Sequence, residues 1–194
     1  HRGPHLRTIA ADAALVVTED VPVEPLASWT RRLARGMDPP VWAVDASCLV
    51  PMRRVPAAVV PRAYRFREAT AAVRRQRLAG DWSDEVHEGP PHRPTLPFEP
   101  VELATADFDA LIATCAIDHA VAPVPHTTGG SRAGYARWRA FVESGLRTYH
   151  RTRNDPMRTG VSRMSPYLHY GHVSPFRIAR EAADVGGDGA RKYL

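Results

Sequence analysis

Lysine and cysteine are both scarce in this chain. Lys192 is the only lysine among the 26 basic residues of a 194-residue sequence, so arginine carries almost all of the positive charge. Together with the many alanines and prolines, this skew indicates a GC-rich coding bias rather than a functional choice. The two cysteines, Cys48 and Cys115, lie far apart and form no metal-ligand spacing. We therefore expect two buried thiols in a reducing compartment.

Long apolar runs are absent as well. No run approaches the roughly 18 apolar residues that a membrane-spanning helix needs, and the first residues contain no apolar stretch of the signal-peptide kind. We expect a cytoplasmic protein that makes no membrane contact. The chain begins with His1 instead of methionine, which indicates that the natural N-terminus lies upstream.

The formal net charge is +5, and the positive surplus is concentrated in residues 61–80. One acidic residue, Glu68, stands there against six arginines: Arg62, Arg65, Arg67, Arg74, Arg75 and Arg77. Such a run can contact nucleic-acid phosphates. More often it forms the solvated face of a helix, and that is the interpretation we favour.

Residues 13–46 have the pattern of a strand, a helix and a second strand. Apolar, β-branched runs at 14–18 and 41–44 predict the two strands. Between them, apolar residues recur at helical spacing: Leu26, Trp29 and Leu33. The sequence therefore predicts part of an α/β domain with a parallel sheet over residues 1–60. No glycine-rich loop follows the first strand, so a dinucleotide-binding fingerprint is absent.

Proline and weak periodicity set the next region apart. We predict that residues 61–125 form a connector between two domains, irregular in its second half, with one short helix near Phe108–Cys115. The prolines that interrupt it are Pro90, Pro91, Pro94, Pro97, Pro100, Pro123 and Pro125. A glycine-rich turn follows, and Ser131 or Thr128 is the expected N-cap of the next helix.

That next helix has the clearest pattern in the chain. One apolar stripe predicts it, with side chains at steps of 3, 4, 4 and 3: Tyr135, Trp138, Val142, Leu146 and Tyr149. We expect Trp138 to pack in the core. Tyr149 ends the stripe beside an unusual segment, so its hydroxyl could point into a site.

Two Ser-Pro pairs in this segment, residues 149–175, predict two helix starts. Ser165-Pro166 and Ser174-Pro175 each fit an N-cap followed by the first helical residue, where proline is tolerated. Gly171 fits the left-handed position just beyond a helix. We expect the second helix to continue through Ala183.

The same segment has the composition of an anion site. A helix N-terminus offers unpaired N–H donors and a partial positive charge. The hydroxyls of Ser162 and Ser165, with the guanidinium of Arg163 or Arg153, would complete a seat for a phosphate. From the pattern alone, ordinary helix starts are the more common explanation of such Ser-Pro pairs.

The segment resembles the start of the flavin-binding helical domain of the photolyase/cryptochrome family. The residues that carry the resemblance are Tyr149, Arg153-Asn154-Asp155-Pro156, Ser162, Met164, Ser165-Pro166 and Gly171. Gly129-Gly130 and Ala133-Gly134 also resemble the family's entry to that domain. The Arg-Asn-Asp-Pro form, and Val44-Asp45-Ala46 followed by Val50-Pro51, are similar to class II members.

The resemblance implies a deoxyribodipyrimidine photolyase, a light-driven lyase that repairs cyclobutane pyrimidine dimers in UV-damaged DNA by electron transfer from reduced FAD. Residues 126–194 would form the first part of its helical FAD-binding domain. The implied FAD contacts are Tyr149, Ser162, Met164 (through its backbone) and Ser165, and no catalytic side chain is implied. The resemblance further implies a monomer, and it leaves a second, antenna chromophore unidentified.

Two departures from the family pattern matter. Val161 stands where many members have threonine, which removes one hydroxyl contact. The chain also ends at Leu194, inside an expected helix and before the helices that would carry the flavin-ring contacts and the lesion pocket. We therefore expect an internal piece of a longer protein, and we expect this piece alone to bind FAD weakly or not at all.

Other functions stay open at this point. A cryptochrome, which is a flavin photoreceptor without repair activity, would share these residues. A flavin-free helical module could use the arginines to bind nucleic acid. A degenerate relative could retain only the scaffold.

Overall fold

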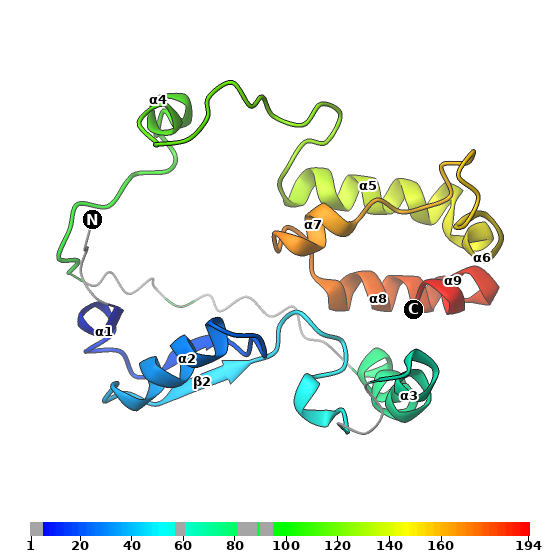
Figure 1. Ribbon diagram of the computed structural model, residues 1–194, viewed down its shortest axis with the longest axis horizontal. Coiled ribbons are helices and arrows are strands. Elements are labelled where there is room, and N and C mark those ends of the chain that lie inside the picture. The colour runs from blue at the N-terminus through cyan, green and yellow to red at the C-terminus, as the bar shows by residue number, and fades with distance from the viewer. Residues whose placement is uncertain (1–5, 57–60, 81–88, 90–94) are drawn as a thin grey trace. The chain divides into compact units, whose positions relative to one another are not determined.

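The computed structural model describes residues 6–56, 61–80, 89 and 95–194 (Figure 1). Its contacts divide the chain into two compact units. The sheet unit contains the described residues up to Val44 and residues 95–125, and the helical unit contains residues 45–80 and 126–194. Part of the predicted connector, with Pro90, Pro91 and Pro94, lies outside the described residues, as do residues 1–5 and 57–60 of the predicted first domain.

The sheet unit confirms the predicted βαβ pattern. It contains α1 (Leu6–Ile9), β1 (Val16–Glu19), α2 (Leu26–Arg35), β2 (Val41–Val44) and α4 (Phe108–Ala113). The two strands pair in parallel, with Val16 opposite Val41 and Glu19 opposite Val44. The Glu24 carboxylate accepts a hydrogen bond from the Ser28 backbone N–H, which satisfies a donor in the first turn of α2.

The short helix predicted near Phe108 is α4. Asp107 is its N-cap, and its carboxylate accepts a hydrogen bond from the Ala110 N–H at 3.0 Å. Cys115 follows the end of this helix and is exposed, while Cys48 is half-buried. The expectation of two buried thiols is therefore wrong, because neither residue lies on a core-facing position.

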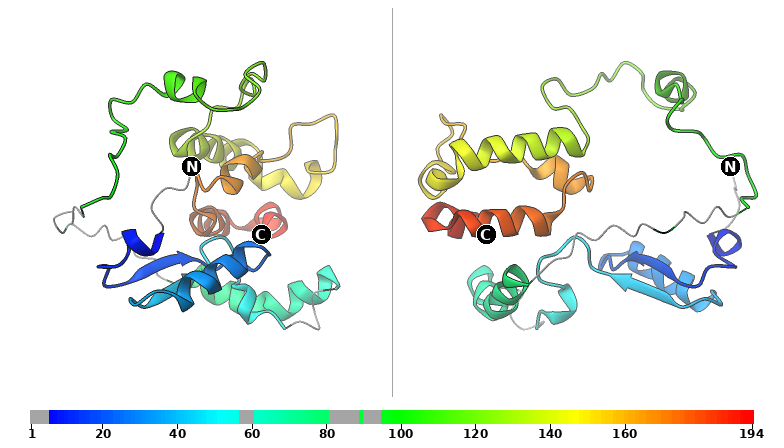
Figure 2. Two further views of the ribbon diagram at one scale, coloured as in Figure 1. Left: turned by 60° about the vertical axis from the view of Figure 1, so that its left-hand side comes forward. Right: turned by 180° about the vertical axis from the view of Figure 1, so that it is seen from behind.

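The helical unit is built from two layers of helix. Its elements are η1 (Met52–Arg54), α3 (Ala63–Ala79), α5 (Ser131–Ser144), η3 (Leu146–Thr148), α6 (Tyr149–Thr152), α7 (Ser165–His169), α8 (Pro175–Val185) and α9 (Gly187–Tyr193). Helix α5 forms one layer, and α8 and α9 form the other, with α7 near one end of α5 and α6 near the opposite end (Figures 1 and 2). None of the helices in the described part of the chain combines the length and apolar character needed to span a bilayer.

The core of the helical unit centres on Trp138, which has no exposed surface. Its ring centroid lies 6.0 Å from that of Phe141 and 5.4 Å from that of Tyr193. The other core residues are Leu146, Met164, Tyr167, Val173, Ile178 and Ala182. The prediction that Trp138 packs in the core is confirmed.

A polar chain joins α5 to α8 beside this core. Trp138 Nε1 donates a hydrogen bond to one Glu181 oxygen at 2.6 Å, and Arg177 Nε donates to the other at 2.7 Å. The Arg177 guanidinium lies 4.4 Å from the centroid of the Tyr135 ring. The Tyr135 hydroxyl accepts from the Ser174 N–H. Because each donor has its acceptor, the burial of the indole N–H carries no unpaired polar group.

The stripe that predicted one helix to Tyr149 is interrupted. Helix α5 ends at Ser144, and the chain continues through η3 and α6. Gly145 lies at the break, where a Cβ would approach the Phe141 ring to 2.8 Å. Glycine is also a poor helix former, so the stripe is correct as a core pattern but wrong as a continuous helix.

Two predicted helix caps are displaced by one residue. Gly130, with φ 91°, is the N-cap of α5, and Ser131 is the first helical residue. Met164 precedes α7, and Ser165 lies within the helix. The N-cap of α8 is Ser174 as predicted, since its hydroxyl accepts from the Arg177 N–H. Gly171 has the predicted left-handed φ of 65°.

Helix α3 lies in the sequence range predicted as connector, and it packs on the helical unit. The Arg77 guanidinium lies 5.2 Å from the centroid of the Phe176 ring of α8, and Arg67 donates to the Arg191 carbonyl of α9. Thr70 is buried. The exposed arginines of the run are Arg62, Arg65, Arg67 and Arg75, consistent with a solvated helix face. The division into domains stays a prediction.

Candidate anion-binding site

A hollow of about 560 Å³ lies in the helical unit beside the predicted phosphate segment. It is lined by side chains of α5, by Tyr167 of α7, and by two loop stretches that contribute His126 and Thr128, and Thr159 and residues 161–163. This volume falls within the usual range of small-molecule sites, about 300–1,000 Å³.

Small side chains on one face of α5 leave the room for this hollow. They follow at steps of 3, 4 and 4: Ala133, Ala136, Ala140 and Ser144. Tyr167 and Thr128 also line the hollow, and they are joined by a hydrogen bond from the Tyr167 hydroxyl to the Thr128 carbonyl at 2.8 Å. Gly134 lets α5 lie close to Tyr167 and Val173, because a Cβ at this position would be 2.9 Å from the Tyr167 ring and 2.7 Å from the Val173 side chain.

Two residues on the lining have an unusual backbone. His126 has φ 64° and Arg163 has φ 54°, and they are the two non-glycine residues with positive φ in the described part of the chain. This left-handed region costs a non-glycine residue about 1–3 kcal/mol and occurs preferentially at functional sites. That both residues line one hollow singles it out from the rest of the surface.

The charge of the lining suits an anion. Arg137, Arg163 and His126 contribute basic groups, and Thr128, Ser144, Thr159 and Ser162 contribute hydroxyls. None of the described lining residues is an aspartate or glutamate. Hydrogen bonds from guanidinium groups to phosphate oxygens are about twice as strong as neutral ones.

Ser162 is held in place by two hydrogen bonds. Its Oγ accepts from the Met164 N–H at 3.4 Å and from the Tyr193 hydroxyl at 3.3 Å. Both bonds use oxygen lone pairs, and a serine hydroxyl carries one hydrogen to donate. The Ser162 hydroxyl hydrogen is therefore available to an anion in the hollow.

The other predicted FAD contacts lie in different settings. The Met164 side chain is buried, and its backbone N–H is directed at Ser162. The Tyr149 ring packs edge-on against Tyr193, with centroids 5.3 Å apart. Tyr193 thus links Tyr149 to Ser162 and Met164. Ser165 is exposed in the first turn of α7 and is not among the residues that line the hollow.

Of the two arginines predicted for the site, Arg163 lines the hollow and Arg153 does not. No sequence pattern identifies Tyr193 as a partner of Ser162. Burial raises the pKa of the Tyr193 phenol. The spacing of Ala190 and Tyr193 on α9 could have placed Tyr193 on the core face, but it could not have identified Ser162 as its partner.

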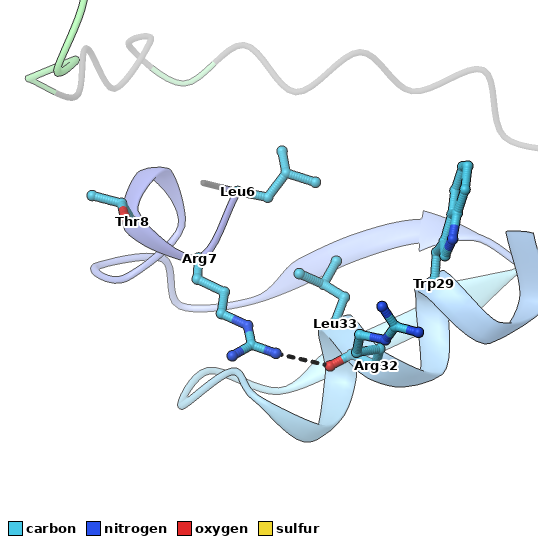
Figure 3. A pocket seen from close by; sticks show the side chains of 6 residues that line it. All are labelled: Leu6, Arg7, Thr8, Trp29, Arg32 and Leu33. Atoms are coloured by element: carbon cyan, nitrogen blue, oxygen red, sulfur yellow. Dashed lines mark hydrogen bonds between the residues drawn. The ribbon is translucent and has the colours of Figure 1, made fainter. Parts of the chain in front are cut away.

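A second hollow, of about 790 Å³, lies in the sheet unit (Figure 3). Leu6, Trp29 and Leu33 supply most of its apolar lining, and Arg7 Nη2 donates to the Arg32 carbonyl at 3.1 Å. No predicted site residue lies there, and the arginine is engaged at the C-terminal end of α2. The hollow of the helical unit is therefore the candidate anion site.

Known relatives match this chain over part of their length. The deoxyribodipyrimidine photo-lyase of Methanothermobacter thermautotrophicus is 24% identical over 184 residues, which are 91% of this chain and 38% of that protein. The rice protein of the same name (Oryza sativa subsp. japonica) is 30% identical over 158 residues, 78% of this chain and 29% of the relative. The chain is related to photolyases. The Thermus thermophilus photo-lyase is 42% identical over 72 residues, 37% of this chain and 17% of that enzyme.

These similarities confirm the photolyase resemblance inferred from the segment of residues 149–175. The chain spans well under half the length of each photo-lyase named above. No protein-family model matches the chain.

Proposed function

We propose that this chain is part of a FAD-dependent, light-driven DNA photolyase that repairs cyclobutane pyrimidine dimers. One observation carries the proposal: Ser162 and Arg163 of a photolyase-like sequence segment line a hollow that contains two arginines and no described carboxylate. The similarity to enzymes named deoxyribodipyrimidine photo-lyase supports the reaction class.

The residues of the hollow fit a pyrophosphate group. The Ser162 hydroxyl can donate to a phosphate oxygen, and the Arg163 guanidinium can neutralise its charge. Arg137 approaches the same space from α5. Tyr149 supports the site through its contact with Tyr193. When bound, light-excited reduced FAD supplies the electron that splits the dimer, and the protein holds and orients the cofactor.

The charge of the helical unit supports DNA as the partner. Residues 45–80 and 126–194 contain 20 arginines and lysines against 7 aspartates and glutamates. A basic surface attracts the phosphate backbone whatever the base sequence. Repair also requires that the dimer leave the base stack, because its bonds are inaccessible within the duplex.

The experiment is a repair assay combined with FAD titration of the complete gene product. We expect light-dependent loss of thymine dimers from an oligonucleotide. Ser162→Ala should weaken FAD binding by about tenfold or more, as expected for a lost hydrogen bond to a charged group. Ser131→Ala is the matched control, because this exposed serine does not line the hollow. Equal FAD affinity of the two variants, or no repair in light, would contradict the proposal.

A further inference from the structure

We propose that Tyr193 is a positioning residue for the anion site, holding the Ser162 hydroxyl so that its hydrogen points to the bound phosphate. This inference rests on the proposed function and extends it to a residue 31 positions away in the sequence. Tyr193 belongs to α9, which does not itself line the hollow.

The geometry restricts what Ser162 can do. The Tyr193 hydroxyl is 3.3 Å from Ser162 Oγ, and the Met164 N–H is 3.4 Å from the same atom. A serine side chain has three staggered rotamers, and a hydroxyl can turn about its C–O bond. Two donors aimed at one oxygen select the orientation that keeps both bonds. The Ser162 hydrogen is then directed away from both donors.

The Tyr193 ring is itself fixed by aromatic contacts. Its centroid lies 5.4 Å from Trp138, 5.6 Å from Phe141 and 5.3 Å from Tyr149. These rings belong to α5 and α6, so the phenol is held on more than one side. A rigid donor restricts the serine hydroxyl more than a mobile donor does. Less conformational entropy of the serine is therefore lost when the ligand binds.

Close packing of α9 brings Tyr193 to this position. Gly189 lies against the carbonyl groups of Leu146 and Arg147 in η3, and a Cβ at Gly189 would collide with them. The helix can therefore approach η3 only with glycine at that position. This contact between Gly189 and η3 fixes the position of α9, and with it the position of the Tyr193 hydroxyl beside Ser162.

The expected size of the effect follows from populations. If loss of the phenol hydroxyl lets Ser162 sample all three rotamers equally, the productive fraction falls to about one third, and the dissociation constant rises about threefold. Loss of the polarisation that the phenol provides adds to this. We expect Tyr193→Phe to weaken FAD binding by about three- to tenfold.

A double-mutant cycle tests the inference. FAD dissociation constants are measured on the complete gene product, freed of flavin, for wild type, Tyr193→Phe, Ser162→Ala and the double variant. The Tyr193→Phe effect should disappear when Ser162 is already alanine, because the phenol then has no hydroxyl to orient. Tyr170→Phe is the matched control, since the Tyr170 side chain is exposed and does not line the hollow.

The outcomes separate this inference from the proposed function. If Ser162→Ala weakens FAD binding but Tyr193→Phe does not, the positioning role is wrong and the FAD site stands. An equal Tyr193→Phe effect in both serine backgrounds would show that the phenol acts on the fold, and this also overturns the inference. If the wild-type protein binds no FAD, both proposals fail. Near-UV circular dichroism of Tyr193→Phe checks that the aromatic cluster is retained.

Discussion

The helical unit and the sheet unit differ in what they bury. The helical unit contains every buried residue of the described chain, including Trp138, Leu146 and Met164. No described residue of the sheet unit is buried, and both Trp29 and Trp42 are more than half exposed. A site needs a supporting shell that fixes its first contacts. The comparison explains why the candidate anion site lies in the unit with a core.

The same two units differ in charge. The described residues 6–44 and 95–125 contain 4 arginines and 10 acidic residues, whereas the helical unit has its large basic excess. The absence of buried residues from the described part of the sheet unit has a simple cause, because a two-stranded sheet with short helices offers too little area to form a core. We expect the basic charge of the helical unit to attract anionic ligands, and this is also the unit with a core to position them.

The largest expected effect comes from replacing one tryptophan in each unit, which tests whether only the helical unit has a core. Trp138→Ala should destabilise the protein by about 3–5 kcal/mol, because it removes a fully buried ring and leaves a cavity. Trp29→Ala should cost at most about 0.5 kcal/mol, since that side chain is 58% exposed. Urea unfolding followed by far-UV circular dichroism measures both. Similar losses from the two substitutions would mean that the sheet unit has a core of its own.

A smaller effect is expected from glycine positions within the helical unit. Gly189→Ala should cost about 1–3 kcal/mol, because the added methyl group pushes α9 away from η3. Gly80→Ala is the control, since a Cβ there would lie 3.5 Å from its nearest neighbour, the Gln76 carbonyl oxygen. The midpoints of urea unfolding compare the two variants. A Gly189→Ala protein as stable as Gly80→Ala would show that α9 can shift without cost.

Much of this fold could be predicted from local sequence patterns. The strands around Val16 and Val41, the helix at Phe108 and the helix start at Ser174 each depend on a few neighbouring residues. Trp138 was correctly expected in the core, because its stripe has a helical period. The break at Gly145 could not be predicted from the apolar stripe. The stripe shows which face of the segment is apolar, and it is the same whether the segment is one α-helix or an α-helix followed by a 3₁₀ turn.

The candidate site was only partly predictable, for a related reason. Ser162 and Arg163 could be selected from the sequence segment 149–175, and they do line the hollow. The bond between Tyr193 and Ser162 joins segments that are distant in sequence. Such contacts depend on how α9 packs against η3, and no local pattern specifies that packing. The FAD roles of Tyr149, Ser162, Met164 and Ser165 stay predictions.

Alkaline pH gives the smallest of the expected effects and again separates the two units. All six tyrosines of the sequence lie in the helical unit, and burial raises the pKa of Tyr193 above its ordinary value of 10.0. The folded state therefore favours the neutral phenol, and this contribution to stability is complete below about pH 10. It is lost as the pH rises through the raised pKa, because the unfolded chain then releases its proton more readily. The urea midpoint is measured at about pH 8 and at about pH 11 for both proteins. Its decrease between these two pH values should be larger in wild type than in Tyr193→Phe, which has no phenol to ionise at position 193. An identical fall in both proteins would show that burial does not raise the pKa of Tyr193 in the folded state.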